Sequence, residues 1–301
     1  MPHTAPAQLI YLNGQFITRD KAVISVMDRG FLFGDGVYEV IPAYSQRLFR
    51  LKEHIERLNH SLKAVRIKNP YTDQQWQEII DKLIQNNEGS NQSIYLQITR
   101  GSDTIREHLC SETIEPTVFI MSNSIKQPSF ADMEKGISVT TVTDIRWHRC
   151  DIKAITLLPN ILMKMQAHDD GANEAILIRN GLATEGAASN LFIVQNDTLI
   201  TPPKSSMLLP GITRDLIIEL AKQHHITSIE ENIKEDQLFQ ADEIWLSSST
   251  KEIRPIISIN KTPVGQGKTG ELWYKMIKHY QEYKAKLGGL SASIQTYPLV
   301  E

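Results

Sequence analysis

Two short clusters of small and hydroxyl-bearing residues lie where a protein could bind a phosphate. Gly211, Ile212 and Thr213 come at the start of an amphipathic run, Thr213 to His224, that predicts a helix. Backbone N–H groups at a helix N-terminus and the Thr213 hydroxyl can donate hydrogen bonds to an anion. An ordinary helix cap without any ligand would have the same sequence, so both interpretations stay open at this point.

The second cluster follows the hydrophobic segment EIWL and consists of Ser247, Ser248, Ser249 and Thr250. Its hydroxyl groups could donate further hydrogen bonds to the same anion. With a phosphate bound, the chemistry would need a lysine that forms a Schiff base, a carboxylate for a heteroaromatic nitrogen and cations for a substrate carboxylate. Composition alone does not select one lysine among the many in this chain.

Three glycines near the C-terminus, Gly265, Gly267 and Gly270, match the letter pattern of a dinucleotide-binding loop. Such a loop should open a βαβ unit, whereas these glycines precede the last long predicted helix. Thr262 stands where a phosphate-binding P-loop requires its first glycine. We therefore interpret the stretch as a turn, and a nicotinamide-dependent oxidoreductase remains as the rival from another enzyme class.

Composition places the chain among globular proteins. Of its 301 residues 41% are hydrophobic and 22% charged, and 32 basic against 35 acidic residues leave a net charge of -3. This charge gives no basic surface for nucleic acid or an anionic membrane. The start, MPHTAPAQLI, lacks the basic and apolar regions of a signal peptide, and no apolar run approaches the length of a membrane span. We expect a cytoplasmic enzyme without nucleic-acid or membrane partners.

The cysteines and histidines do not predict a metal site. Cys110 and Cys150 cannot form a disulfide framework and have no second ligand at zinc-finger spacing. His224 and His225 lie at a predicted helix end, also without partners at ligand spacing. Each is best interpreted as an ordinary core or surface residue.

Hydrophobic periodicity predicts strands and helices that alternate without a regular βαβ repeat, which is typical of an α+β protein. A hairpin is expected around Asn13-Gly14, and Thr72 with Gln75 predicts a helix capping box. A polar, proline-bearing stretch separates two mixed domains. The predicted limits are residues 1–122 for a small N-terminal domain, 123–134 for a linker, 135–287 for a C-terminal cofactor-binding domain and 288–301 for a tail.

Seven segments, in this order, resemble fold-type IV pyridoxal-phosphate aminotransferases, and most of all their D-amino-acid (D-alanine) branch. They are RGFLFGDGVYEV (29–40), HIERL (54–58), TRGSDTIREH (99–108), DIRWHRCDIK (144–153), ATEGAASNLF (183–192), LPGITRD (209–215) and SSSTKEI (247–253). The resemblance reaches to about residue 285 and implies two domains with pyridoxal 5'-phosphate in the cleft between them.

The resemblance also implies roles for individual residues. Lys153 matches the lysine that binds the cofactor as a Schiff base and serves as general acid and base, and Glu185 matches the carboxylate that pairs with the pyridine nitrogen. The residues that match the phosphate site are Arg57, Ile212, Thr213, Ser248 and Ser249. The two clusters described above would thus share one ligand.

Tyr38, Arg106 and His108 match the residues that bind the substrate α-carboxylate in the D-specific branch, where the R-x-H pair is donated across a homodimer interface. A guanidinium can form two parallel charge-assisted hydrogen bonds to a carboxylate. The implied reaction moves an amino group from a D-amino acid such as D-alanine to a 2-oxo acid such as 2-oxoglutarate, giving D-glutamate. Within the same fold, a branched-chain L-amino-acid aminotransferase and an aminodeoxychorismate lyase remain alternatives.

One departure concerns the residues after Glu185. Relatives often carry serines there, whereas this chain has Ala187 and Ala188, so one or two hydroxyls near the cofactor are missing. We expect this change to affect the hydrogen bonds around the cofactor more than the type of reaction. His148 receives no role.

Overall fold

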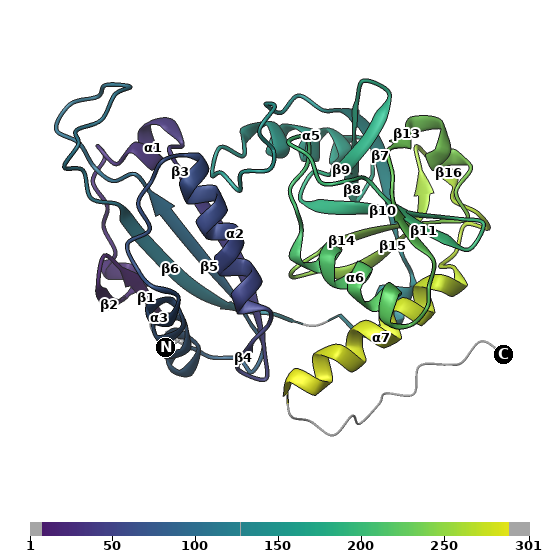
Figure 1. Ribbon diagram of the computed structural model, residues 1–301, viewed down its shortest axis with the longest axis horizontal. Helices are drawn as coiled ribbons and strands as arrows, with labels where there is room; N and C mark the ends of the chain where they lie inside the picture. Colours follow the sequence, from purple (N-terminus) through teal and green to yellow (C-terminus); the bar gives the residue numbers. More distant parts are fainter. Residues whose placement is uncertain (1–7, 127, 289–301) are drawn as a thin grey trace, which may run out of the picture. The chain divides into compact units, whose positions relative to one another are not determined.

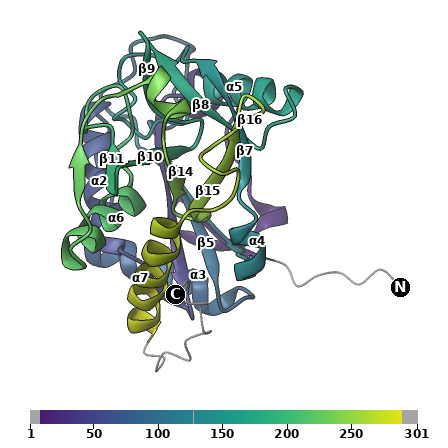
Figure 2. The ribbon, with the colours of Figure 1, turned by 90° about the vertical axis from the view of Figure 1, so that its right-hand side faces the viewer.

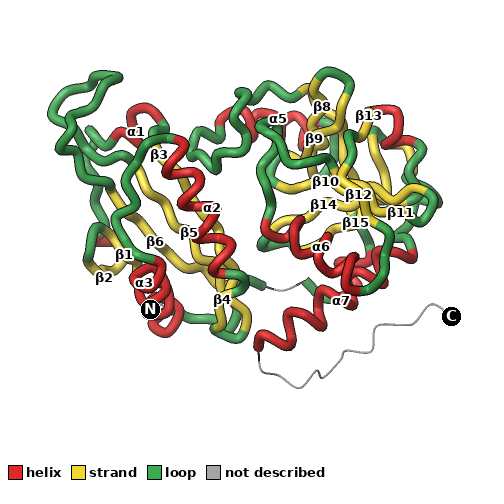
Figure 3. The backbone as a smooth tube through the Cα atoms, in the orientation of Figure 1, coloured by secondary structure: helices red, strands yellow, loops and turns green. Residues whose placement is uncertain are grey.

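The computed structural model describes residues 8–126 and 128–288, which form two compact units (Figure 1). Unit 1 contains the described residues up to Lys126 together with Ile152–Thr156, and unit 2 contains the remaining described residues. Each unit has its own β-sheet with helices against it (Figure 3), which confirms the predicted α+β class. The tail predicted from residue 288 lies outside the described residues, apart from Gly288 at the end of the last helix.

Unit 1 is built on an antiparallel sheet of six strands in the order β2-β1-β6-β5-β3-β4. The strands are β1 (Leu9–Leu12), β2 (Gln15–Thr18), β3 (Gly36–Tyr44), β4 (Arg47–Leu48), β5 (Gln92–Thr99) and β6 (Thr117–Ser124). Asn13 and Gly14, both with positive φ, form the two-residue turn between β1 and β2. The predicted hairpin is therefore confirmed.

The helices of unit 1 are η1 (Arg19–Lys21), α1 (Arg29–Phe33), α2 (Leu51–Ala64) and α3 (Asp73–Asn86). Leu58 of α2 and Trp76 of α3 join the strands in one hydrophobic core. The start of α3 has the predicted capping box, because the Thr72 hydroxyl accepts from Gln75 N while the Gln75 side chain accepts from Thr72 N. Local sequence signals thus determine where these helices begin, and burial determines which faces turn inward.

The segment Ile152–Thr156 returns to unit 1 after the chain has entered unit 2. Tyr38 N donates to Lys153 O at 2.9 Å, and Ile155 N donates to Gly36 O at 3.1 Å. The segment therefore extends the sheet beside the beginning of β3. This differs from the predicted continuous domain over 135–287, because backbone hydrogen bonds to a distant strand leave no signal in the local sequence. The predicted linker 123–134 also differs, since β6 runs to Ser124 and α4 (Phe130–Glu134) forms within it.

Unit 2 contains a ten-stranded sheet whose main path is β12-β11-β10-β14-β15-β7-β8-β9-β13. Because β9 pairs with both β8 and β10, the central strands close into a barrel. The strands are β7 (Ile137–Thr143), β8 (Glu174–Arg179), β9 (Leu182–Gly186), β10 (Ser189–Gln195), β11 (Thr198–Thr201), β12 (Ser228–Glu230), β13 (Ile233–Lys234), β14 (Glu243–Ser248), β15 (Glu252–Ile259) and β16 (Thr262–Pro263).

The other helices of unit 2 are α5 (Leu158–Asp169), α6 (Ile212–Gln223), η2 (Glu235–Phe239) and α7 (Glu271–Gly288). Figures 1 and 2 both show α7 beside α6, and α7 also contacts β14. Among the described helices, none combines the length and the apolar character that a membrane span requires.

Helix α5 forms as predicted, but it does not bury the apolar face on which the prediction rested. Met163 and Ala167 pack into the core, whereas the opposite side carries exposed side chains. Their exposed fractions are 65% for Leu158, 52% for Ile161, 48% for Leu162 and 56% for Met165. These positions recur at helical spacing, so the chain presents a continuous apolar face on α5.

Helices α6 and α7 meet through two histidines. The rings of His224 and His279 stack with centroids 3.5 Å apart at an interplanar angle of 10°. Burial lowers the pKa of His279, and the neighbouring His224 lowers it further, although Glu282 acts in the opposite direction. A histidine whose pKa is lower in the folded state makes folding less favourable as the pH falls through its ordinary value of about 6.5.

We predict that the melting temperature of the protein decreases as the pH is lowered from about 8 to about 5.5. His279→Gln should make this decrease smaller, because it removes a histidine whose protonation the folded state disfavours. Thermal unfolding followed by circular dichroism at both pH values measures the effect. His168→Gln, at a histidine whose side chain is 88% exposed, is the matched control. An unchanged pH dependence in His279→Gln would show that His279 does not contribute to the fall in stability.

Candidate active site

Lys153 lies in the returning segment of unit 1, where its backbone is held on both sides. Its N–H donates to Ser61 Oγ on α2 at 3.1 Å, and its carbonyl accepts from Tyr38 on β3. The Lys153 ammonium nitrogen lies 4.1 Å from the centroid of the Tyr38 ring. In the described part of the chain no carboxylate forms an ion pair with Lys153. A lysine placed in this way has a fixed backbone and an amine that is available for chemistry.

Arg57 lies on α2, and a buried carboxylate fixes its side chain. Glu39, with no exposed surface, accepts from Arg57 Nε at 2.7 Å through Oε1 and from Nη2 at 2.8 Å through Oε2. His54 Nδ1 lies 2.8 Å from Glu39 Oε2. Burial alone would raise the pKa of Glu39, but Arg57 and His54 together hold it well below its usual range. Glu39 thus stays ionised and sets the plane of the Arg57 guanidinium.

Glu185 lies in unit 2, on the strand β9, and is only 4% exposed. Its carboxylate accepts from Arg146 Nη1, from Asn190 Nδ2 at 3.2 Å and from Leu209 N at 3.2 Å. Burial raises the pKa of Glu185, while the Arg146 charge and the hydrogen bonds oppose that rise. A buried carboxylate with a guanidinium beside it can stabilise a cationic ring nitrogen.

Arg146 is itself held by a second carboxylate. Asp144 accepts from Arg146 Nε at 2.9 Å and from Nη2 at 2.9 Å, and it also pairs with Arg179 Nη2 at 2.9 Å. The charges of Glu185 and Asp144 are therefore balanced by those of Arg146 and Arg179. Arg146 was not among the predicted site residues, although it lies in the quoted segment DIRWHRCDIK. The sequence indicated this role only through the position of Arg146 two residues after an acidic residue, Asp144.

Asn190 joins Glu185 to the beginning of α6. Besides its bond to Glu185, its Nδ2 donates to Leu209 O at 2.8 Å. Gly211, the N-cap of α6, packs so closely that an added Cβ would lie 1.8 Å from Asn190 Oδ1. Asn190 was also absent from the predicted site, because its role depends on partners on two different segments.

In the part of the chain that the structure describes, no side chain caps the first turn of α6, and Ile212 and Thr213 are buried at its start. The N–H groups at such a helix end are suited to an anion such as a phosphate. Strand β14 ends nearby, since Ser247 pairs with Asn190 in the sheet. The Ser247 hydroxyl is buried and has no hydrogen-bond partner among the described residues, which is an unusual condition for such a group.

The two serines predicted for the phosphate site follow directly, and both are half-buried. Ser248 Oγ accepts from Lys251 N at 3.3 Å. The structure therefore groups Glu185, the start of α6 and the end of β14 within unit 2, and it groups Lys153 and Arg57 within unit 1. The chemistry of both groups fits pyridoxal phosphate, which offers a cationic ring nitrogen and an anionic phosphate.

The predicted substrate-binding residues lie in unit 1 but do not meet there. Tyr38 is on β3, whereas Arg106 and His108 are exposed on the loop between β5 and β6. Within the described residues no hydrogen bond joins Tyr38 to either of them. Their predicted role across a subunit interface stays a prediction. His148 is exposed, Ala187 is buried and Ala188 is exposed, and none of the hydrogen bonds described above involves their side chains.

The glycine-rich stretch is a turn, as predicted. An added Cβ at Gly265 would lie 2.4 Å from Asp242 O, and one at Gly270 would lie 2.2 Å from Glu243 Cδ. The Glu243 carboxylate accepts from Leu272 N at 2.8 Å and from Trp273 N at 3.0 Å, so it occupies the N-terminus of α7. An external phosphate therefore has no place at the start of this helix.

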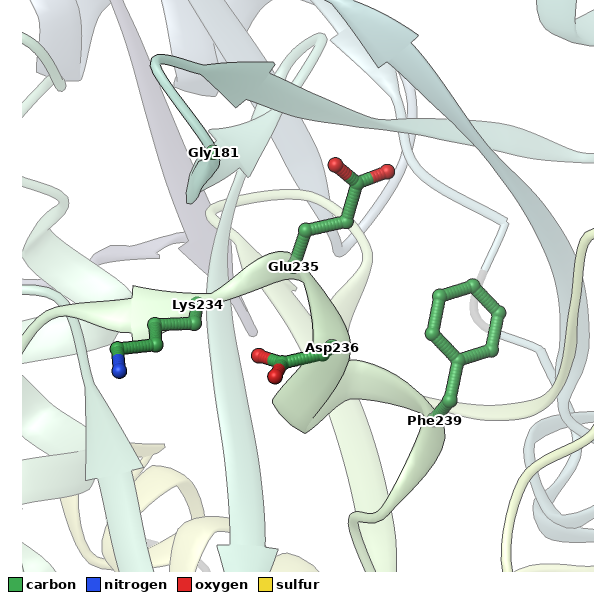
Figure 4. Close-up of a pocket in the computed structure, with 5 residues that line it drawn as sticks. All are labelled: Gly181, Lys234, Glu235, Asp236 and Phe239. Carbon is green, nitrogen blue, oxygen red and sulfur yellow. The ribbon is translucent and has the colours of Figure 1, made fainter.

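One surface pocket lies apart from all these residues (Figure 4). It has a volume of about 450 Å³ and is lined by Gly181, Lys234, Glu235, Asp236 and Phe239. None of the predicted site residues lines it. In the described chain, no group of three or more histidine, cysteine or acidic side chains could hold a metal ion.

Comparisons with known proteins agree with the chemistry of these groups. The family model described as amino-transferase class IV matches residues 36–259. The D-alanine aminotransferase of Bacillus licheniformis is 36% identical over 263 residues, covering 87% of this chain and 92% of that protein. The D-alanine aminotransferase of Staphylococcus haemolyticus is 35% identical over 274 residues, covering 91% and 97%.

Solved structures show the same fold. The T.th. branched-chain amino acid aminotransferase with pyridoxamine 5'-phosphate aligns with a TM-score of 0.87 and 26% identity, covering 94% of this chain and 95% of that one. The Escherichia coli branched-chain amino acid aminotransferase aligns with a TM-score of 0.86 and 27% identity, covering 97% and 98%. The predicted fold and family are confirmed, and the chain belongs to the class IV aminotransferase family.

Proposed function

We propose that this protein is a pyridoxal-phosphate-dependent aminotransferase that transfers an amino group from D-amino acids to 2-oxo acids. D-alanine and 2-oxoglutarate, giving pyruvate and D-glutamate, are the substrate pair that we favour. The preference for D-amino acids is supported by relatives named D-alanine aminotransferase, whose alignments cover 87% and 91% of the chain. It is also supported by the R-x-H pair, Arg106 and His108.

The observation that carries the cofactor assignment is the cluster around Asn190. There a buried and charge-balanced carboxylate is joined by one side chain to a helix N-terminus that has no side-chain cap. We propose that the cofactor-binding residues of unit 1 are Lys153 and Arg57, and that those of unit 2 are Glu185, Ile212, Thr213, Ser248 and Ser249.

When bound, pyridoxal phosphate supplies a ring that withdraws electrons from the substrate Cα. Lys153 Nζ would hold the cofactor covalently and, when free of it, would serve as general base and general acid for the proton of the substrate Cα. Glu185 would accept a hydrogen bond from the pyridine N–H and so keep that nitrogen charged. Arg57 in unit 1 and the N–H groups at the start of α6 in unit 2 are the groups suited to bind a phosphate.

The substrate carboxylate would be bound by Tyr38, Arg106 and His108. With the carboxylate and the amine both held, only one face of Cα can be turned toward Lys153, so these three residues would select the substrate's configuration. A second function has specific support, because the two solved structures described above are branched-chain amino acid aminotransferases. In that case the R-x-H pair would not bind the carboxylate, and L-leucine would react.

We also propose that the protein is a homodimer, since among the described residues no hydrogen bond joins Tyr38 to Arg106 or His108. The exposed apolar face of α5 supports this proposal, because a face of this kind is usually covered in an assembly. A cytoplasmic location is part of the same proposal. It is supported by Cys110 and Cys150, which are both unpaired, as expected in a reducing compartment.

The function is tested by single-turnover half-reactions with the cofactor-loaded enzyme. D-alanine, L-leucine and aminodeoxychorismate are added separately, and the absorbance of the bound cofactor is followed. We expect D-alanine to convert the cofactor and release pyruvate, with L-leucine and aminodeoxychorismate inactive. Faster conversion by L-leucine would favour the branched-chain alternative, and release of pyruvate from aminodeoxychorismate would favour the lyase.

We predict that Lys153→Ala abolishes the covalent attachment of the cofactor and lowers the half-reaction rate by about 10²- to 10⁴-fold, because the variant lacks both the amine that binds the cofactor and the proton carrier. Borohydride reduction followed by mass spectrometry measures the attachment. The control is Lys52→Ala on α2, at a side chain that is 83% exposed. A reducible adduct of normal yield in Lys153→Ala would exclude Lys153 as the site of attachment.

The dimer proposal predicts that Leu162→Asp on α5 produces a monomer, because a carboxylate in an apolar interface must lose its hydration without gaining a partner. Size-exclusion chromatography with light scattering measures the mass. Phe239→Asp, at an exposed side chain of η2, is the control and should stay dimeric. A monomeric wild type would overturn the proposal, and a dimeric Leu162→Asp would show that α5 is not the interface.

A further inference from the structure

The loop between β5 and β6 carries Arg106 and His108, and both side chains are exposed. An exposed loop has many backbone conformations, so a pair of residues on it can bind a small carboxylate well only if the loop is held. Two carbonyl groups in the middle of the loop, those of Glu107 and His108, are hydrogen-bonded to a side chain from another element.

That side chain is Arg29, the first residue of α1, which is only 5% exposed. Its Nη1 donates to Glu107 O at 2.6 Å and its Nη2 donates to His108 O at 2.8 Å. Its Nε donates to Asp35 Oδ2 at 3.0 Å. One planar guanidinium therefore joins two consecutive positions of the R-x-H segment to a fixed carboxylate.

Asp35 is fixed in turn by a second arginine. Arg100 Nε donates to Asp35 Oδ2 at 2.7 Å, and Arg100 Nη2 donates to Oδ1 at 3.0 Å. Arg100 also donates to Val65 O at 2.7 Å, at the end of α2. The Arg29 guanidinium is thereby tied to the body of unit 1 and cannot swing freely with the loop.

The base of the loop is closed independently of Arg29. Asp103 accepts from Thr104 N at 2.8 Å and from Ser111 N at 2.8 Å, so the two ends of the segment 104–111 are held together. Arg29 then determines the backbone conformation between those ends.

Phe33, at the end of α1, contacts the two functional side chains directly. Its ring centroid lies 4.8 Å from Arg106 Cζ and 5.6 Å from the His108 ring. Arg29 Cζ lies 4.9 Å from the same centroid. The short helix α1 thus contacts the loop twice, through backbone hydrogen bonds at one end and through an aromatic ring at the other.

We propose that Arg29 and Phe33 are positioning residues for the recognition of the substrate carboxylate. Arg29 fixes the backbone at residues 107 and 108, and Phe33 fixes the directions of Arg106 and His108. This inference rests on the proposed function, in which the R-x-H pair binds the α-carboxylate. An arginine is required at position 29, since three fixed N–H directions serve three acceptors and a lysine ammonium cannot reproduce that geometry.

The test compares D-alanine with D-alaninol, which has the same configuration and amine but no carboxylate. We expect Arg29→Lys to lower the half-reaction kcat/KM for D-alanine by about 10- to 100-fold through loss of positioning. The value for D-alaninol should stay within about twofold of the wild type, since no carboxylate is involved. Phe33→Leu, which keeps the backbone hydrogen bonds, should show the same selective loss to a smaller degree. Arg106→Ala is the reference for loss of the carboxylate contact itself.

A second measurement needs no turnover. Amide hydrogen exchange in residues 104–111 should become faster in Arg29→Lys, while exchange in β3 and β5 stays as in the wild type. The control variant is Arg19→Lys, at an exposed arginine whose guanidinium donates to Gln8 Oε1 at 3.2 Å and is not bonded to the loop in the described structure. If Arg29→Lys does not fold, Phe33→Leu carries the comparison of the two substrates.

Equal losses for D-alanine and D-alaninol, or unchanged exchange in residues 104–111, would overturn the proposal. Failure of the proposed function has a different signature. A wild-type protein that does not react with any D-amino acid would reject the D-aminotransferase assignment, and an unchanged D-alanine rate in Arg106→Ala would reject the carboxylate role of the loop. In both cases the exchange data would still report whether Arg29 holds the loop.

Discussion

Glu39 and Arg57 are buried together, and each compensates the charge of the other through two hydrogen bonds. Removing one partner of a buried pair usually costs about 3–5 kcal/mol, because the other charge is left without water or a counterion. The pairing therefore does more than stabilise the contact between β3 and α2. It forces the Arg57 guanidinium into the plane of the Glu39 carboxylate, and so determines how a phosphate could approach it. The packing of unit 1 around this pair is consequently inseparable from the geometry of the proposed phosphate site.

The same constraint operates around Glu185, with a different balance. Burial there raises the pKa of the carboxyl group and so disfavours the charged form that a cationic ring nitrogen requires. Arg146 opposes that tendency, and Asp144 keeps Arg146 in place from the other side. Because a carboxylate and a guanidinium alternate along this chain of contacts, each charge is compensated locally. Loss of any member would leave another charge unpaired, so the cluster can be expected to act as one unit.

Local signals in the sequence predicted the local features correctly. The turn at Asn13-Gly14 and the capping box at Thr72 depend on residues within three positions of one another, and both are present. The family and the fold could be predicted because several short segments occur together in the right order. The roles of Arg146 and Asn190 could not, because Arg146 contacts Glu185, 39 residues away, and Asn190 contacts Leu209, 19 residues away. The return of residues 152–156 to unit 1 depends on backbone hydrogen bonds to β3, and such bonds leave no pattern of side-chain types in the sequence.

The face of α5 was predicted as apolar, but periodicity alone does not distinguish a face that is buried within the chain from one that is left for another surface.

Two helices of unit 2 begin after a glycine, and only one of them is suited to bind an external anion. At α7 the carboxylate of Glu243 already accepts from the first N–H groups, and the preceding glycine leaves room for that carboxylate. At α6 the glycine instead leaves room for Asn190, whose Nδ2 is directed to Leu209 O and Glu185, and the structure records no side-chain cap at this helix end among the described residues. Both helices follow a glycine, but they differ in the group that packs against it. At α7 this group is a carboxylate that accepts from the helix N–H groups, and at α6 it is an amide that does not cap the helix. A glycine-rich letter pattern therefore indicates close packing, and the partner of the helix N-terminus decides whether a phosphate can bind.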